Sequence, residues 1–358
     1  MRIFGLASVL TVLIFGATLW WGGPEMLAIV AILGVLELSL SFDNAIVNAT
    51  VLRRMSEFWQ RIFLTLGILI AVFGMRLVFP ILIVAFTADL SPLGAFRLAL
   101  EDPAAYSSEL ASARPAIASF GGMFLLMIFL DFLLQDREFA WLKWIERPLS
   151  RLGGVESIGV AFALMVLLLT AALFGGDYQG TVLISGCTGV VVFILVNGLA
   201  GFFEIEADPL DEKASGIAGP AADATGATAA TGKAALFLFL YLEVLDASFS
   251  FDGVIGAFAI TTNIVLIAAG LGIGAIYVRS LTIYLVRKGT LTRYVYLEHG
   301  AHYAIGALAV ILLVSLAHEV PELLSGLVGV TVILLAVGSS VLHNRRGRGA
   351  MGAGSLSN

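Results

Sequence analysis

The chain has 358 residues, of which 59% are hydrophobic and 13% are charged, with a net charge of −6. Soluble globular proteins carry about 25% charged residues, so this composition excludes that class and indicates an integral membrane protein. Nucleic acid is not an expected partner, because the chain has no basic patch beyond the short stretch 345–348. The single cysteine, Cys187, excludes an intramolecular disulfide, a CxxC redox pair and a cysteine-rich metal site.

Ten apolar stretches are long enough to be membrane helices. Residues 2–21 are interpreted as a retained first helix rather than a cleaved signal, because Trp20-Trp21 is typical of an interfacial anchor and no small-residue cleavage site follows. The other nine lie near residues 25–52, 61–87, 116–135, 156–175, 180–203, 234–260, 263–286, 301–317 and 322–342.

The loops between these stretches indicate a topology. With the N-terminus inside, most of the 20 Lys and Arg residues fall in loops on one side, as expected of cytoplasmic loops. We therefore expect both termini in the cytoplasm, with residues 345–358 as a disordered basic tail. Residues 88–115 would form an external loop with a short surface helix before Asp102-Pro103. The low-complexity residues 204–233 would form a cytoplasmic linker.

An acidic, serine-rich motif occurs twice inside these apolar stretches. The sequence ELSLSFDN at residues 37–44, within the segment 36–49, aligns without a gap with DASFSFDG at residues 246–253, within the segment 243–257. The two copies lie five membrane crossings apart, and an odd number gives them opposite polarity. We therefore predict an all-α polytopic membrane protein built as a five-plus-five inverted repeat, with halves at 1–178 and 179–344.

The spacing of the first motif places polar groups on two sides of a helix. One stripe contains Glu37, Ser41, Asn44 and Asn48, whereas Ser39 and Asp43 form another. Such a helix cannot face lipid, so it should lie at the centre of the bundle with some local unwinding near the Ser-Phe-Asp sequence.

Charge counting then indicates the ligand. The acids expected inside the membrane are Glu37, Asp43, Asp131, Glu243, Asp246 and Asp252. The expected charge partners inside the membrane are Arg76 and Arg279, each in the helix after a motif. A surplus of buried carboxylates must protonate or bind a cation. Oxygen donors suit Mn²⁺, Ca²⁺ or Mg²⁺ better than Zn²⁺ or Cu, which favour His or Cys.

The predicted metal ligands combine the polar residues of both motifs: Glu37, Ser41, Asp43, Asn44, Glu243, Asp246, Ser250 and Asp252. The secondary candidates are Asp131, Glu298, His299 and His302. Asp131 has the alternative interpretation of an acid near the end of its span. The other three have metal-ligand spacing on one helix turn, but a satisfied cluster at the membrane edge is the favoured interpretation.

The motif residues also carry a family resemblance. Residues 37–44 and 246–252, together with 141–148 and 298–303, resemble the TerC-like family of bacterial integral membrane proteins in the LysE/TerC superfamily, in a branch catalogued as a domain of unknown function. The resemblance implies Mn²⁺ efflux or metal homeostasis, and a location in the bacterial cytoplasmic membrane. The chain departs from the family pattern at Gly253, where the second motif usually continues with serine.

The leading hypothesis is a secondary transporter that exports a divalent metal cation, with Mn²⁺ the expected ion and Ca²⁺ an alternative, by alternating access with proton exchange. An accessory factor for metal loading of exported proteins, or for metal or tellurite stress, is the alternative without net transport. Export of a cationic organic solute is a third hypothesis. No enzymatic activity and no tightly bound cofactor are expected. The expected partners are the lipid bilayer and the metal ion, and a homo-oligomer is left open.

Overall fold

The computed structural model describes residues 2–137, 139–153, 157–206, 229–318 and 320–354. Within these ranges the regular elements are all helical, and the one β-type pairing is an isolated bridge between Met55 and Ala230. Most of the expected linker at 204–233 lies outside the described residues. The all-α fold expected from the composition is confirmed for the described part of the chain.

The helices follow one another in this order: α1 (Arg2–Leu40), α2 (Phe42–Leu52), α3 (Glu57–Leu69), η1 (Ile70–Val78), α4 (Phe79–Thr87), α5 (Pro92–Glu101), α6 (Pro103–Ser112), α7 (Arg114–Leu134), α8 (Lys143–Leu152), α9 (Ile158–Phe174), η2 (Gly176–Tyr178), α10 (Gln179–Glu206), α11 (Gly232–Ile260), α12 (Ile264–Arg287), α13 (Thr290–Arg293), α14 (Leu297–Val314) and α15 (Glu322–Gly354).

Eight of the helical segments in the described part of the chain are long and apolar enough to cross a membrane. They are Ile3–Leu40, Glu57–Thr87, Arg114–Leu134, Gly176–Leu199, Gly232–Phe258, Ile264–Arg287, Leu297–Val314 and Gly326–Asn344. The first of these covers the expected span 2–21 and the first part of the span 25–52, which continues as α2, and the span expected at 156–175 is the shorter apolar helix α9. The protein is therefore a multi-pass membrane protein.

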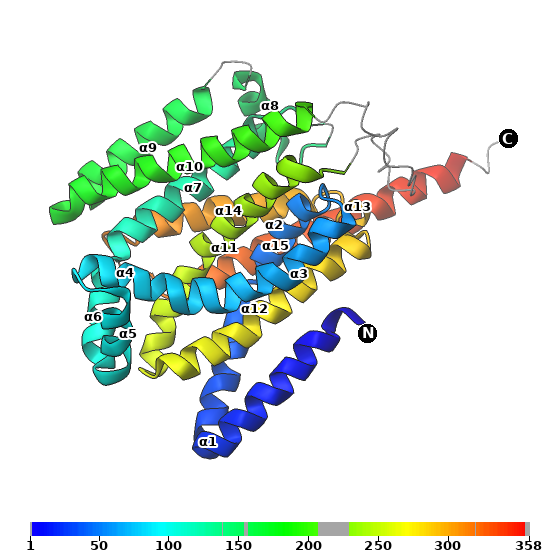
Figure 1. Ribbon diagram of the computed structural model, residues 1–358. Coiled ribbons are helices and arrows are strands. Elements are labelled where there is room, and N and C mark those ends of the chain that lie inside the picture. The colour runs from blue at the N-terminus through cyan, green and yellow to red at the C-terminus, as the bar shows by residue number, and fades with distance from the viewer. Residues whose placement is uncertain (1, 138, 154–156, 207–228, 319, 355–358) are drawn as a thin grey trace.

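Helix α1 is bent sharply at Gly23. This glycine has φ 71° and ψ −167°, a conformation that side chains with a Cβ rarely adopt, and Pro24 follows it. Figure 1 shows the two arms of α1 at a steep angle to each other. The second arm packs against α12 through small residues, because a Cβ on Gly274 would lie only 2.5 Å from the Cβ of Glu37.

The centre of the bundle is formed by α7, α14 and the motif helices α2 and α11. Helix α7 is apolar around its whole circumference and most of its side chains are buried, as expected of a central helix. Val47 of α2, Phe124 of α7, Leu245 of α11 and Ile305 of α14 belong to one continuous hydrophobic core. The motif helices therefore run through the interior.

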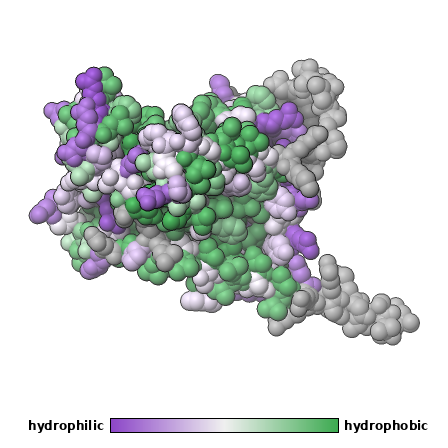
Figure 2. Space-filling view, turned by 90° about the horizontal axis from the view of Figure 1, so that it is seen from below, coloured by the Kyte–Doolittle hydropathy of each residue, from purple (hydrophilic) through white to green (hydrophobic). Residues whose placement is uncertain are grey.

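The outer surface is mainly apolar. Leu168 and Leu173 of α9 and Ile184 of α10 are exposed large hydrophobic side chains, as expected where helices face lipid. Figure 2 shows hydrophobic residues over most of the middle of one face, with many of the hydrophilic ones towards its ends. In Figure 1 the beginning of α1 and the end of α15 lie on the side away from α5 and α6.

Two further regions, the segment before α7 and the end of α15, can be compared with the predictions made from the sequence. The short helix expected before Asp102-Pro103 is confirmed as α5. The next helix, α6, begins at Pro103, and Asp102 caps it, because Asp102 Oδ1 accepts a hydrogen bond from Ala105 N at 3.0 Å. Helix α15 continues to Gly354, so most of the residues expected to form a disordered tail are helical. An existing helix extends without a new nucleation cost, which accounts for this difference.

Candidate functional site

The first motif lies across a break between two helices. Helix α1 ends at Leu40 and α2 begins at Phe42, with Ser41 between them at φ −97° and ψ 16°. The second motif lies within the continuous helix α11. The local opening expected near the Ser-Phe-Asp sequence is thus present at Ser41 in the first copy and absent from the second.

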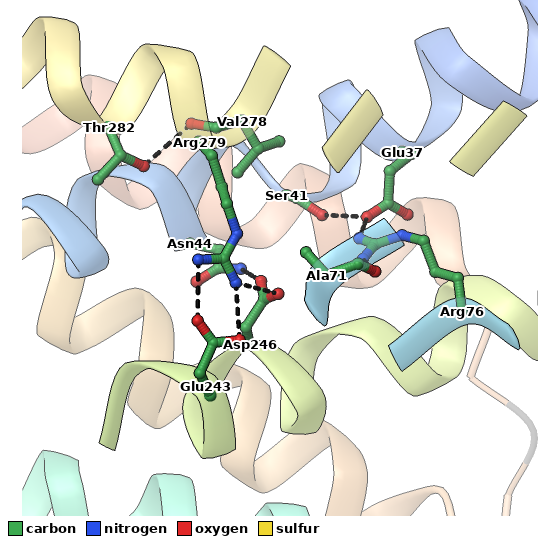
Figure 3. Close-up of polar contacts among 10 residues, drawn as sticks. All are labelled: Glu37, Ser41, Asn44, Ala71, Arg76, Glu243, Asp246, Val278, Arg279 and Thr282. Carbon is green, nitrogen blue, oxygen red and sulfur yellow. Dashed lines mark hydrogen bonds and ion pairs between the residues drawn. The ribbon is translucent and has the colours of Figure 1, made fainter. Parts of the chain in front are cut away.

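The first copy forms a buried ion pair with the helix that follows it. Glu37 Oε1 is bound by Arg76 Nη2 and accepts a hydrogen bond from Ser41 Oγ at 3.1 Å (Figure 3). Arg76 lies in the π-helical segment η1, and its Nη1 donates to the Ala71 carbonyl oxygen at 2.6 Å. Such π-helical segments are frequent at functional sites. All three side chains of this cluster are buried.

The second copy forms a larger buried cluster around Arg279 of α12. Its Nη1 and Nη2 donate to the two carboxylate oxygens of Glu243, each at 3.0 Å, and Nη2 also donates to Asp246 Oδ2 at 3.1 Å. This paired arrangement is the strong form of a charge-assisted hydrogen bond. The guanidinium lies over the Phe63 ring, 4.3 Å from its centroid. A Cβ at Gly67 would lie 2.4 Å from Arg279 Nη1, so α3 approaches the cluster closely at this position.

The two clusters meet where α2 contacts α11. Asn44 Nδ2 of α2 donates to Asp246 Oδ1 of α11 at 2.8 Å. Helix α11 also approaches the end of α1, because a Cβ at Gly253 would lie 3.0 Å from Glu37 Oε2. Figure 3 shows both clusters in this one region, contributed by α1, α2, η1, α11 and α12. The two sequence motifs therefore contribute to a single buried polar region.

The charges in this region do not balance among the described side chains. Glu37 is matched by Arg76, whereas Arg279 faces two carboxylates, Glu243 and Asp246. One negative charge is left over if all three acids are ionised. The side chains of Asp43 and Asp252, both predicted ligands, lie outside the described part of the structure. Within that part, no group of three or more His, Cys, Asp or Glu residues is arranged to hold a metal ion.

Two buried polar side chains in the motif helices lack hydrogen-bond partners. Both polar atoms of Asn48, which is fully buried, and the hydroxyl of Ser250 have no partner among the described residues. Leaving such groups unsatisfied costs about 1–3 kcal/mol each. Asn48 was not among the predicted ligands, although it lies one helical turn after Asn44. Gly67 was also missed, because a glycine in an apolar helix carries no sequence pattern that points to an arginine.

The secondary candidates lie elsewhere, near the end of α7 and the start of α14. Glu298 binds Arg53 Nη2 at 2.9 Å and Arg137 Nη1 at 2.8 Å. His302 stacks on Phe132, with the ring centroids 4.1 Å apart. This arrangement already uses the Glu298 carboxylate in contacts within the protein.

The two remaining candidates in this area also have protein partners. A ring nitrogen of His299, Nε2, is 2.7 Å from the Phe139 carbonyl oxygen. Asp131 is exposed, and its Oδ2 accepts a hydrogen bond from Gln135 at 2.9 Å. Neither residue joins the buried region formed by the motifs.

Comparison with known protein families gives a match over most of the chain. A family model described as "Protein of unknown function (DUF475)" matches residues 42–347. No curated protein and no solved structure matches the chain. The matched range begins at Phe42, so it includes only the last three residues of the first motif, 42–44, and all of the second.

Proposed function

The chain belongs to the DUF475 family, whose members are described as proteins of unknown function, and we propose that it is a secondary transporter that exports a divalent metal cation, with Mn²⁺ the expected ion. The observation that carries the proposal is the contact between Asn44 and Asp246, because it joins the two acidic motifs in the interior of a membrane protein. Ionisable groups in such positions are costly and mark ion pathways in membrane proteins.

The chemistry of this contact suits a hard cation. The Asp246 carboxylate is shared, since Oδ1 is held by the neutral Asn44 amide and Oδ2 by a single hydrogen bond from Arg279. Glu243, in contrast, is held by two hydrogen bonds from the same guanidinium. Asp246 is therefore the carboxylate that can change partner at the lower cost. Carboxylate and amide oxygens are the donors that Mn²⁺, Ca²⁺ and Mg²⁺ prefer.

Proton exchange follows from the same surplus charge. When no metal is bound, the extra carboxylate of the Arg279 cluster is stabilised by a proton, because an unpaired buried charge is strongly disfavoured. Metal binding would displace this proton, and protonation from the other side of the membrane would favour metal release. The direction of metal movement would then be set by the proton gradient.

We further propose ten membrane crossings arranged as a five-plus-five inverted repeat, with both termini in the cytoplasm of a bacterial cell. The bend at Gly23 supports counting α1 as two crossings, and the apolar α9 supports a further one. Glu37 and Asp246 occupy equivalent motif positions, and each binds the arginine of a following helix, Arg76 or Arg279. Inverted halves with a site near the membrane midplane are common among secondary transporters.

The test is metal flux. Purified protein in liposomes is given a proton gradient, and ⁵⁴Mn²⁺ movement is compared between the wild type, the Asp43→Asn/Asp252→Asn double variant and the matched control Asp177→Asn, which alters an exposed acid outside the candidate residues. We expect flux in the wild type and the control and its loss in the double variant. Unchanged flux in the double variant would reject the motif site.

An accessory role in metal loading or metal stress, without net transport, is the second candidate. It is favoured by the observation that Glu37, Glu243 and Asp246 are all bound to arginines, as in a static charge network. Liposomes distinguish the two functions, because an accessory factor would bind the metal and give no flux.

A further inference from the structure

A polar cavity of about 350 Å³ lies beside α8, and it shares no residue with the motif clusters. It opens to the surface and is lined by the end of α7, by α8, and by Tyr296 and His343 from the C-terminal part of the chain. Lys143, Arg147 and Ser150 line it from α8. Its position at the end of an apolar span places it at a membrane boundary.

The acidic residue that α8 contributes to the cavity, Glu146, already has hydrogen-bond partners within the protein. The two carboxylate oxygens of Glu146 accept hydrogen bonds from the backbone N–H groups of Leu142 at 2.9 Å and Trp141 at 3.1 Å, and one of them also accepts from Tyr303 Oη at 3.2 Å. Glu146 Oε2 also lies 3.4 Å from His299 Nε2. This carboxylate is therefore committed to holding the start of α8 against α14.

The basic residues of α8 are not committed in this way. Lys143 and Arg147 line the cavity, and neither has an ion-pair partner among the described residues. Arg137, by comparison, is bound to Glu298 at 2.8 Å and to Gln135 at 3.1 Å.

Two further acids bear on the charge of the cavity. Asp136 is an exposed lining residue, and Glu138 lies outside the described residues. Among the described lining residues, two uncommitted cations thus face one uncommitted acid.

Helix α8 has the features of an interfacial helix. Lys143, Arg147 and Arg151 are spaced four residues apart and so form one exposed basic stripe. Trp144 is 77% exposed, and tryptophan is enriched where a membrane protein meets lipid headgroups. Because α8 connects two apolar helices, α7 and α9, its basic side chains lie where anionic lipid headgroups are concentrated.

We propose that this cavity is a binding site for a phosphate group, presented by the headgroup of an anionic membrane lipid. Lys143 and Arg147 would neutralise the phosphate. The hydroxyls of Ser150 and Tyr296, which now make long contacts with the Arg147 carbonyl oxygen at 3.3 Å and with His343 Nδ1 at 3.4 Å, would turn to donate to it. The adjacent leaflet supplies such a ligand at high local concentration, which favours the lipid over free phosphate as the source. Lipid bound here would brace α8 against α7 and α14.

Native mass spectrometry of the detergent-purified protein tests the site. Phosphatidylglycerol, phosphatidylcholine and inorganic phosphate are each titrated into the wild type, a Lys143→Gln/Arg147→Gln double variant and the control Arg151→Gln. Arg151 lies on the same stripe of α8 and does not line the cavity. We expect phosphatidylglycerol to bind the wild type more tightly than phosphatidylcholine, and the double variant to lose at least about tenfold in affinity for it, with little change in the control.

Three results would count against the proposal. Equal binding of phosphatidylglycerol to the wild type and the double variant would overturn the site. An equal loss in Arg151→Gln would show general attraction to the basic stripe and would also overturn it. Inorganic phosphate binding that depends on Lys143 and Arg147, without any such dependence for phosphatidylglycerol, would overturn the lipid as the source. The charge-preserving variant Lys143→Arg/Arg147→Lys should retain binding, which separates loss of charge from misfolding.

Discussion

Replacing Arg279 by glutamine removes the cation that holds Glu243 and Asp246 together in the interior. We expect the free energy of unfolding to fall by about 3–5 kcal/mol, the usual cost of breaking a buried ion pair from one side. The side chain of Arg279 is 1% exposed, so water cannot replace the lost interactions.

The magnitude follows from the contacts. Arg279 donates three hydrogen bonds to the two carboxylates, at 3.0, 3.0 and 3.1 Å. Hydrogen bonds to charged groups contribute about 1.5–3 kcal/mol each, so their simple sum would exceed the expected loss. Protonation of the stranded acids recovers part of that sum. Asp246 also keeps its hydrogen bond from Asn44, so the larger part of the loss should come from Glu243.

The assay is unfolding in mixed micelles, followed by circular dichroism as the fraction of denaturing detergent increases. The matched control is Arg287→Gln, which changes an exposed arginine in the last turn of the same helix and should leave the transition nearly unchanged. The double variant Arg279→Gln/Glu243→Gln should regain part of the lost stability, because it removes one stranded charge. An Arg279→Gln transition coincident with that of the wild type would refute this account of the cluster.

Two glycine substitutions test the packing around the site. Gly67→Ala places a Cβ 2.4 Å from Arg279 Nη1, so we expect the free energy of unfolding to fall by about 1–3 kcal/mol in the same assay. The control Gly198→Ala should be neutral or slightly stabilising, because its Cβ meets no atom within 4 Å. A Gly67 variant as stable as the wild type would contradict the close approach of α3. Gly23→Ala forces a Cβ into a backbone with φ 71°, so the free energy of unfolding should fall by about 1 kcal/mol or more. The control Gly16→Ala, in the straight part of α1, should cause no such loss. Equal effects of these two changes would argue against the bend.

Much of the fold could be predicted from composition and periodicity. Apolar stretches of about 20 residues must become helices in a bilayer, because every backbone polar group has to be satisfied internally. The apolar stretches correctly predicted the long helices, and the break at Asp102-Pro103 correctly predicted the short helix before it. Residues 156–175 were predicted to form a separate span, and the structure has a 17-residue helix, α9, inside this range. Neither composition nor periodicity indicated that Arg76 would lie in a π-helical segment.

The composition of the buried site was easier to predict than its contacts. Two arginines among several acids indicated ion pairing, but the sequence did not show which acid each arginine would bind. The distribution is set by close approach of helices. Gly67 leaves room for Arg279 beside Glu243, and Gly274 brings the Glu37 segment of α1 against α12. Such contacts depend on how the helices are rotated about their axes, and hydrophobic periodicity is weak in helices that are apolar on every side.

The central claim is that the joined motifs form a cation site inside the membrane. Isothermal titration calorimetry of the purified protein with Mn²⁺ measures this most directly, with Asp246→Asn as the test variant and Asp177→Asn as the control for an exposed acid. The account predicts saturable Mn²⁺ binding by the wild type and the control, and markedly weaker binding by Asp246→Asn. Binding of equal strength in all three proteins, or no binding by the wild type, would contradict it.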